Sequence, residues 1–268
     1  MKKILITGAT DGIGLETAIL AANKGFDLLL HGRSEDKLEK AVAAVKSANP
    51  SITVHQYLAD LSKFADIEDL TQKIENEHKN IDVIINNAGI FKTSTPLTED
   101  GLDVRFVVNT FAPIMISKAL LPLLNKDGRI VNLSSAAQAP INMLAITGEQ
   151  PINEAFQAYA QSKLALTIWT QEFAKMLEAG QICVAVNPGS MLASKMVKEG
   201  FGVAGNDLSI GAQILLNASI DASFIGASGK YFDNDSQQFA QPHTFALKQS
   251  NRDDVVRVLY STIEKYTS

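Results

Sequence analysis

The sequence predicts an α/β fold, a doubly wound parallel β-sheet with helices on both faces. Short β-branched and aliphatic runs alternate with longer segments of helical pattern through most of the 268 residues, as in a sheet whose strands are joined by helices. Several runs, such as Val83–Ile85 and Ile182–Val184, are apolar throughout, which is typical of strands buried on both faces. Because no long linker interrupts the alternation, we expect one domain over residues 1–268.

Six strands and five connecting helices are expected, in alternation. The strands are predicted at Ile4–Thr7, Asp27–His31, Thr53–Leu58, Asp82–Asn86, Arg129–Leu133 and Ile182–Val186. The helices are predicted at Gly14–Lys24, Glu35–Ser47, Asp66–His78, Leu102–Leu124 and Glu154–Leu177. A last amphipathic helix around Val255–Ile263 would pack on the domain or on a neighbouring subunit.

The composition argues against several classes of protein. A net charge of −5 and a pI near 5.4 give no electrostatic support for nucleic-acid binding. No apolar stretch approaches the roughly 18 residues that suggest a membrane span, and the start of the chain has no room for a signal peptide. The single cysteine, Cys183, cannot form an intrachain disulfide. We therefore expect a cytoplasmic protein with no membrane span and no nucleic-acid partner.

A glycine-rich turn follows the first predicted strand and opens the first helix. Its glycines allow a tight turn and let the backbone approach a pyrophosphate at the positive N-terminus of the helix. The residues of this turn predicted to bind the cofactor are Gly8, Thr10, Asp11, Gly12, Ile13 and Gly14. The spacing G-x-x-x-G-x-G is looser than G-x-G-x-x-G, and no Gly-Lys-Ser/Thr of a P-loop follows. Glycines also serve ordinary turns, but the strand before and the helix after favour dinucleotide binding.

Tyr159 and Lys163 lie four residues apart in a predicted helix, so their side chains project from one face. A free phenol has a pKa of about 10, and a cation at about 4 Å contributes ~1 kcal/mol in water but nearer ~4 kcal/mol at the effective dielectric of a protein site. Lys163 would therefore lower the pKa of Tyr159 only inside a cleft. Such a pair also occurs on solvated helix faces, so the surrounding motifs decide between the two interpretations.

With the glycine turn and this pair, the chain resembles the short-chain dehydrogenase/reductase family from Thr7 to about Phe232. Other matching stretches are Asp60-Leu61, Asn86-Asn87-Ala88-Gly89, Asn109, Ile130–Ser135 and Asn187-Pro188-Gly189. The resemblance implies a single-domain Rossmann-type fold and an oxidoreductase that transfers a hydride between a nicotinamide and a carbonyl/alcohol substrate. It also makes a homo-oligomer, a dimer or a tetramer, plausible.

The resemblance assigns roles to four catalytic residues. Ser135, the second of a serine pair with Ser134 as its neighbouring alternative, would donate a hydrogen bond to the substrate oxygen. Tyr159 would be the general acid/base. Lys163 would lower the pKa of Tyr159 and bind the nicotinamide ribose. Asn109 would anchor a water that links Lys163 to solvent.

The residues at the end of the second predicted strand indicate whether the cofactor is NAD(H) or NADP(H). An NAD site usually has an acidic residue where this chain has Gly32, and Arg33 follows directly. A guanidinium can hold a 2′-phosphate through paired charge-assisted hydrogen bonds, so we favour NADP(H) over NAD(H). Asp11 is a mild counterweight, and Arg33 could simply end a strand at the surface. By resemblance, the remaining cofactor contacts are Ser34, Asp60 (to the adenine amino group), Leu61, Asn87, Ala88, Gly89, Tyr159, Lys163, Pro188, Gly189 and Ser190.

Two segments depart from the pattern of the family. Ser135 and Tyr159 lie 24 positions apart, a longer gap than in most members, and an insertion at 137–153 is expected to loop over the active-site mouth. A similar insertion occurs in members resembling retinol dehydrogenases, which suggests an apolar or bulky carbonyl substrate. Residues 190–206 are interpreted as a substrate lid. Ala193 stands where the family commonly has a threonine near the nicotinamide, with Ser190 and Ser194 as substitutes.

Other chemistries find less support. The four histidines (His31, His55, His78 and His243) are dispersed without metal-ligand spacing, so no metal is expected. A non-catalytic dinucleotide-binding redox sensor is the alternative function, but a sensor would not need the complete catalytic set. A sugar-nucleotide epimerase or dehydratase would need a larger C-terminal substrate domain than this chain has.

Overall fold

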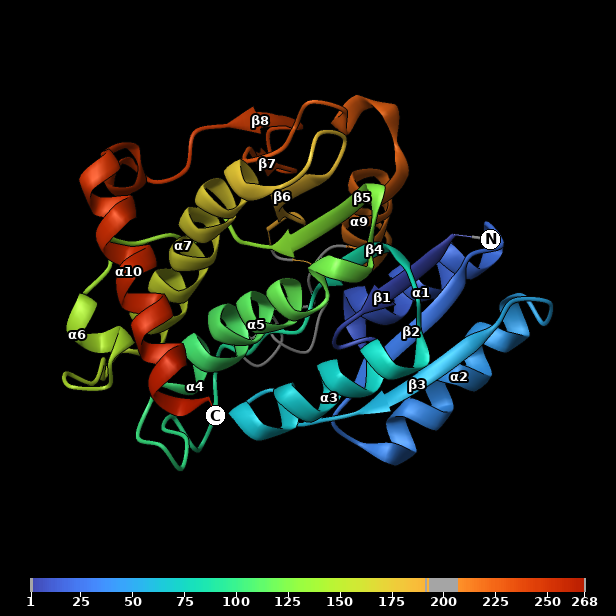
Figure 1. Ribbon diagram of the computed structural model, residues 1–268, viewed down its shortest axis with the longest axis horizontal. Coiled ribbons are helices and arrows are strands. Elements are labelled where there is room, and N and C mark those ends of the chain that lie inside the picture. Colours follow the sequence, from blue (N-terminus) through green and yellow to red (C-terminus); the bar gives the residue numbers. More distant parts are fainter. Residues whose placement is uncertain (1, 191, 193–206, 268) are drawn as a thin grey trace.

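The computed structural model describes residues 2–190, 192 and 207–267 and contains one eight-stranded sheet in the order β3-β2-β1-β4-β5-β6-β7-β8 (Figure 1). Neighbouring strands pair in parallel except β7 and β8, which are antiparallel. The strands are β1 (Lys3–Ile6), β2 (Asp27–Gly32), β3 (Val54–Leu58), β4 (Ile81–Asn86), β5 (Leu124–Leu133), β6 (Ile182–Asn187), β7 (Tyr231–Asp233) and β8 (Gln238–Ala240). The predicted α/β fold with a mostly parallel sheet is confirmed.

Helices cover both faces of the sheet. One layer contains α1 (Gly12–Asn23), α2 (Glu35–Ala48) and α9 (Leu208–Ile220). The other contains α3 (Phe64–Glu77), α4 (Val104–Phe106), α5 (Ala112–Ala119), α7 (Ala155–Phe173) and α10 (Gln249–Tyr266), with the short helix α6 (Met143–Ile146) beside α10 (Figure 1). Within the described ranges, no helix is both long enough and apolar enough to cross a membrane.

Strand β1 shows how the sheet is buried on two sides. Leu5 packs into the core beneath α3, α5 and α7, whereas Ile4 and Ile6 pack into the core beneath α1, α2 and α9. All three side chains are fully buried. This two-sided burial explains why the central strands are apolar at successive positions, as the sequence predicts.

The segment predicted as one helix over Leu102–Leu124 is instead broken into several turns. Helix α4 begins after Asp103, and the backbone widens into a π-helical turn over Val107–Phe111 before α5. Pro113 has no N–H and cannot donate the usual hydrogen bond to the carbonyl four residues earlier, that of Asn109, which explains the widening. After α5, a 3₁₀ turn at Leu121–Leu123 leads into β5.

Helix α10 packs on its own chain. The indole Nε1 of Trp169 in α7 donates to the hydroxyl of Tyr260 at 3.1 Å, and Lys118 Nζ lies 4.2 Å from the centre of the same tyrosine ring. Val255 and Leu259 are fully buried beneath the helix. The sequence predicts that this helix packs either on the domain or on a neighbouring subunit, and in the structure it packs on the domain.

Two of the histidines meet, in contrast to the prediction that all four are dispersed. His55 in β3 and His78 at the end of α3 have ring centroids 4.7 Å apart in an edge-to-face arrangement, and Glu77 lies beside them. This contact could not be predicted from the sequence, because the two histidines are 23 positions apart and meet only where the end of α3 packs beside the edge strand β3.

Candidate active site

A cavity of about 1360 Å³ lies at the carboxyl ends of the central strands. The strand order reverses there, since β1 is flanked by β2 on one side and by β4 on the other. Such a switch point is where open α/β sheets bind ligands. Every residue predicted from the sequence to contact the cofactor lines this cavity, and so do Ser135, Tyr159 and Lys163. Asn109 does not line it.

The glycine turn is packed so closely that side chains are excluded at its centre. A Cβ added to Gly14 would lie 2.3 Å from the carbonyl oxygen of Gly8 and 2.4 Å from Asn87 Nδ2. Gly8 and Gly12 adopt φ angles of 64° and 53°, which L side chains rarely adopt. The turn therefore brings bare backbone to the N-terminus of α1, where N–H groups and the helix dipole suit a pyrophosphate.

His31 and Thr7 support this turn from beneath and were not identified in the sequence. His31 Nδ1 accepts a hydrogen bond from Gly8 N at 3.2 Å, while the opposite ring nitrogen donates to the carbonyl of Ala59 at 3.1 Å. Burial lowers the pKa of His31 to about 4, so the ring is neutral at pH 7 and can accept that bond. Thr7 Oγ1 accepts from Asn87 N at 3.1 Å. Strand periodicity indicates that such residues are buried but not what they contact.

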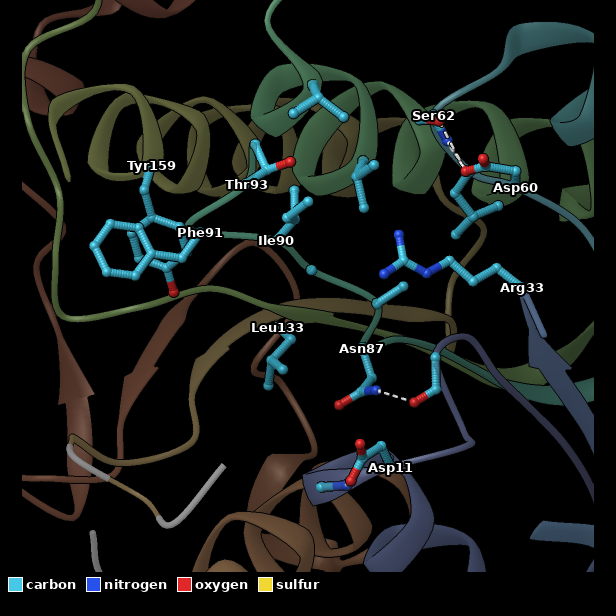
Figure 2. A pocket seen from close by; sticks show the side chains of 18 of the residues that line it. Asp11, Arg33, Asp60, Ser62, Asn87, Ile90, Phe91, Thr93, Leu133 and Tyr159 are labelled. Carbon is cyan, nitrogen blue, oxygen red and sulfur yellow. Dashed lines mark hydrogen bonds between the residues drawn. The ribbon is translucent and has the colours of Figure 1, made fainter. Parts of the chain in front are cut away.

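Positive charge gathers where the second strand ends. Arg33 reaches into the cavity (Figure 2), and Lys37, four residues later in α2, also lines it. Lys37 Nζ lies 3.5 Å from a carboxylate oxygen of Asp11, which offsets the acidic character of the glycine turn. A Cβ at Gly32 would lie 2.4 Å from Thr10 Cγ2, so an acidic residue would require Thr10 to move. Lys37 lies in the first turn of α2, directly after the strand end that carries Arg33, and this proximity in the sequence is the signal that could have identified it.

The two serines point to different places. Ser134 Oγ lies 2.6 Å from Thr167 Oγ1 and is buried against α7. Ser135 Oγ accepts from Ala137 N at 3.1 Å and is hydrogen-bonded with the phenol of Tyr159. The geometry therefore favours Ser135, rather than Ser134, as the serine that accompanies Tyr159.

Burial dominates the ionisation of the tyrosine–lysine pair. It raises the pKa of Tyr159, against a smaller opposing effect of the hydrogen bond with Ser135. Burial also lowers the pKa of Lys163 to about 7. Lys163 Nζ donates to the carbonyl of Leu133 at 2.7 Å and lies 5.8 Å from the centre of the Tyr159 ring. The predicted lowering of the Tyr159 pKa by Lys163 is therefore not observed, because desolvation outweighs an ammonium directed elsewhere.

Asn109 supports the cavity wall rather than entering the cavity. Its Oδ1 accepts from Ile90 N at 2.8 Å, and its Nδ2 donates to Ile90 O at 3.0 Å and to Ser162 Oγ at 2.9 Å. The side chain is fully buried. Because both ends of the amide are engaged, the side chain positions Ile90, a cavity residue. The role of Asn109 in anchoring a water stays a prediction.

The insertion does not loop over the mouth of the cavity as predicted. Of residues 137–153, Ala137 alone lines the cavity. Ile141 and Ile146 are buried in the core shared with α7 and α10, and Asn142 N donates to Gln161 Oε1 at 2.9 Å. Its apolar residues gain more from burial in that core than they would at a solvent-exposed mouth.

Most of the predicted lid at 190–206, including Ala193 and Ser194, lies outside the described residues. Ser190 and Leu192 are described, and both line the cavity. The hydroxyl of Ser190 donates to Asp235 Oδ2 at 2.5 Å, and its backbone N–H donates to Asp235 Oδ1 at 2.7 Å. Asp235 therefore holds the first residue of this segment.

An aromatic wall flanks Tyr159. The rings of Phe91 and Tyr159 lie beside each other (Figure 2), with centroids 5.1 Å apart. The centroid of Phe91 also lies 6.2 Å from that of Phe156. All three rings line the cavity, together with Leu97. Neither phenylalanine was identified in the sequence, where Phe91 follows the asparagine loop and Phe156 opens α7 without a recognisable motif.

Fold and site together define a class, the oxidoreductases that bind a nicotinamide dinucleotide on an open α/β sheet. The chain belongs to one family of that class, since the short chain dehydrogenase family model matches residues 2–201.

Individual relatives agree with this assignment. Retinol dehydrogenase 13 of Homo sapiens is 29% identical over 262 residues, which cover 90% of this chain and 78% of the relative. A short chain dehydrogenase from Shigella flexneri 2a str. 301, solved in complex with NADP, is 26% identical with a TM-score of 0.68 and coverage of 87% and 96%. An uncharacterized protein from Mycobacterium paratuberculosis shares the fold, with a TM-score of 0.81, 24% identity and coverage of 98% and 94%.

The buried lysine should make stability depend on pH. The unfolded chain keeps the Lys163 proton up to an ordinary pKa of 10.5, whereas the folded protein releases it near 7. The unfolded state thus binds more protons between these values, so the contribution of Lys163 to the free energy of unfolding should increase across that range, by up to about 1.4 kcal/mol per pH unit. Urea unfolding at pH 7, 8 and 9 should show this increase in the natural protein but not in Lys163→Met. Parallel pH profiles for the two proteins would contradict it.

Proposed function

We propose that the protein is an NADP(H)-dependent oxidoreductase that transfers a hydride between the nicotinamide and a carbonyl/alcohol substrate, with Tyr159 as general acid/base. The proposal rests on one observation, that the predicted catalytic residues and the predicted cofactor-binding turn line the same cavity. Ser135, Tyr159 and Lys163 converge in it, and the bare glycine turn with Arg33 lines another part of the same cavity. The bound nicotinamide would supply or accept the hydride.

The protein's own residues handle the oxygen and its proton. Ser135 would donate a hydrogen bond to the substrate oxygen and hold it beside the phenol. In the reductive direction, Tyr159 would give its proton to that oxygen, and a phenol whose pKa is raised by burial is protonated and ready to do so. Lys163, with a pKa near 7, can restore that proton or keep a positive charge close to the developing phenolate.

Two observations support NADP(H). Arg33 and Lys37 both line the cavity at the end of β2, where a 2′-phosphate would need cations, and Gly32 presents no carboxylate to repel it. The Shigella relative is solved with NADP.

Removing Arg33 should therefore weaken NADPH binding selectively. We expect Arg33→Ala to reduce NADPH affinity roughly 10- to 100-fold, because charge-assisted hydrogen bonds are worth about 1.5–3 kcal/mol, and to leave NADH affinity nearly unchanged. Fluorescence titration of both nucleotides measures this, with Lys79→Ala, outside the cavity, as the control. Tighter binding of NADH than of NADPH by the natural protein would disprove the nucleotide assignment.

The proposed substrate is an apolar carbonyl compound or alcohol. The support is the aromatic wall of Phe91 and Phe156 beside Tyr159, and the names of relatives such as retinol dehydrogenase 13. NADPH oxidation across matched apolar and polar ketones, aldehydes and quinones tests it, with higher kcat/KM expected for the apolar member of each pair. The cytoplasmic location and the homo-oligomer stay predictions.

A further inference from the structure

A second group of side chains that could bind a metal ion lies at the outer edge of the sheet. His55 in β3, with Glu77 and His78 at the end of α3, offers one ligand atom each, and these atoms all lie within 4.8 Å of one another. None of the three residues lines the active-site cavity. The group is therefore separate from the site described above, and nothing in the proposed function uses it.

The hydrogen bonds around His78 determine which of its nitrogens is available. Lys3 Nζ lies 3.3 Å from Nδ1, and because an ammonium can only donate, Nδ1 carries the lone pair. The opposite nitrogen, Nε2, then bears the proton and donates to the hydroxyl oxygen of Tyr57 at 2.7 Å. Tyr57 in turn donates to Glu77 Oε2 at 2.6 Å. The lone pair of His78 thus already faces a cation.

We propose that His55, Glu77 and His78 bind a divalent first-row transition-metal ion such as Zn²⁺, in the position that the Lys3 ammonium now approaches. Two imidazoles and a carboxylate suit Zn²⁺, Ni²⁺ or Cu²⁺ and do not suit Mg²⁺. Tyr57 orients two of the ligands through their second atoms, which is how outer hydrogen bonds fix metal-binding histidines. The carbonyl end of α3 adds favourable negative potential.

To close around an ion, the ligand atoms must approach one another from their present spacing of up to 4.8 Å. Zinc–nitrogen bonds of about 2.0–2.1 Å in a tetrahedral site place ligand atoms roughly 3.3 Å apart. Glu77 is exposed and His55 is partly exposed, so both can rotate toward His78, which is buried and fixed. The Lys3 side chain is only partly buried and can turn to solvent. A bound ion would tie the edge strand β3 to the end of α3.

Titration of the untagged 268-residue chain with Zn²⁺, followed by calorimetry, tests the proposal. We expect one ion per chain, no comparable binding of Mg²⁺, and an at least tenfold lower affinity in His55→Ala and in Glu77→Gln, two substitutions at exposed or partly exposed positions. His243→Ala removes a histidine elsewhere in the chain and should bind as the natural protein does. Co²⁺ should give the visible absorption of a nitrogen–oxygen site, which His55→Ala should abolish.

Two outer variants separate this site from adventitious zinc on surface histidines. Lys3→Met removes the competing cation and should raise Zn²⁺ affinity about tenfold or more. Tyr57→Phe removes the hydroxyl that orients the His78 ring and the Glu77 carboxylate, and it should lower the Zn²⁺ affinity about 10- to 100-fold. Zinc binding that is unchanged by His55→Ala, or that is unchanged or weakened by Lys3→Met, would overturn the proposal. Each readout is metal binding rather than turnover, so failure here would leave the proposed oxidoreductase function untouched.

Discussion

Tyr159→Phe should reduce turnover by roughly 10²–10⁴-fold and leave NADPH affinity nearly unchanged. Phenylalanine keeps the ring that packs 5.1 Å from Phe91, so the wall of the cavity should remain. What is lost is the hydroxyl that is hydrogen-bonded with Ser135 and that would pass a proton to the substrate oxygen. The glycine turn and Arg33, which would hold the phosphates, are not contacted by this hydroxyl.

Steady-state kinetics and nucleotide titration on the same preparation measure the two effects. Tyr260→Phe is a matched control, since it removes another hydroxyl of a tyrosine whose pKa is also raised by burial, on α10 and outside the cavity. That variant should keep its kcat. Near-normal activity of Tyr159→Phe would rule out Tyr159 as the general acid/base, and unmeasurable nucleotide binding would show that the ring is structural.

Strands β1, β2, β4, β6 and the second half of β5 could be predicted because burial on both faces leaves a direct trace in the sequence, an apolar run with little alternation. The edge strand β3 is mostly half-buried or exposed, and it could be predicted only from its place in the alternation of strands and helices. Helix α9 left no comparable trace. It packs closely against α1 and is apolar around most of its circumference, with Leu215 and Leu216 fully buried, so it shows no amphipathic period. Strands β7 and β8 have three residues each, too few to show a pattern of either kind.

The candidate site divides in a similar way. Residues whose spacing is fixed by local backbone, such as Gly14 in its turn or Lys163 one helical turn after Tyr159, could be placed from the sequence alone. Residues that act across the fold, such as His31 beneath Gly8, could not, since their partners are distant in the chain. The ionisation of Lys163 belongs to the second kind, because a Coulomb argument from spacing omits the desolvation that dominates it.

A buried ion pair near the start of α4 should be a major determinant of stability. Arg105 donates from Nε to Asp103 Oδ1 at 2.7 Å and from Nη2 to Oδ2 at 2.5 Å. The two side chains are only 3% and 5% exposed. Asp103→Ala would leave a guanidinium buried without its partner, and breaking such a pair typically costs about 3–5 kcal/mol.

Urea unfolding should show this loss in Asp103→Ala. The double variant Asp103→Ala/Arg105→Met should recover part of it, since removing both charges leaves none unpaired. The exposed pair of Asp254 and Arg257, with side chains 54% and 70% exposed, provides the control. Asp254→Ala should cost less than about 1 kcal/mol. Equal losses of unfolding free energy in Asp103→Ala and Asp254→Ala would show that the buried pair contributes no more to stability than the exposed pair.

The same pair connects stability to the site. Arg105 Nη1 reaches the carbonyl of Ala155 at 3.5 Å, at the first turn of the helix that carries Phe156 and Tyr159. If the pair anchors that turn, Asp103→Ala should lower kcat/KM even at a temperature where the variant is fully folded. Asp103→Asn keeps a hydrogen-bond acceptor for Arg105 but not the charge. It should therefore recover a larger share of the lost kcat/KM than of the lost free energy of unfolding. Full activity in folded Asp103→Ala would confine the pair to a structural role, because Tyr159 would then keep its place without it.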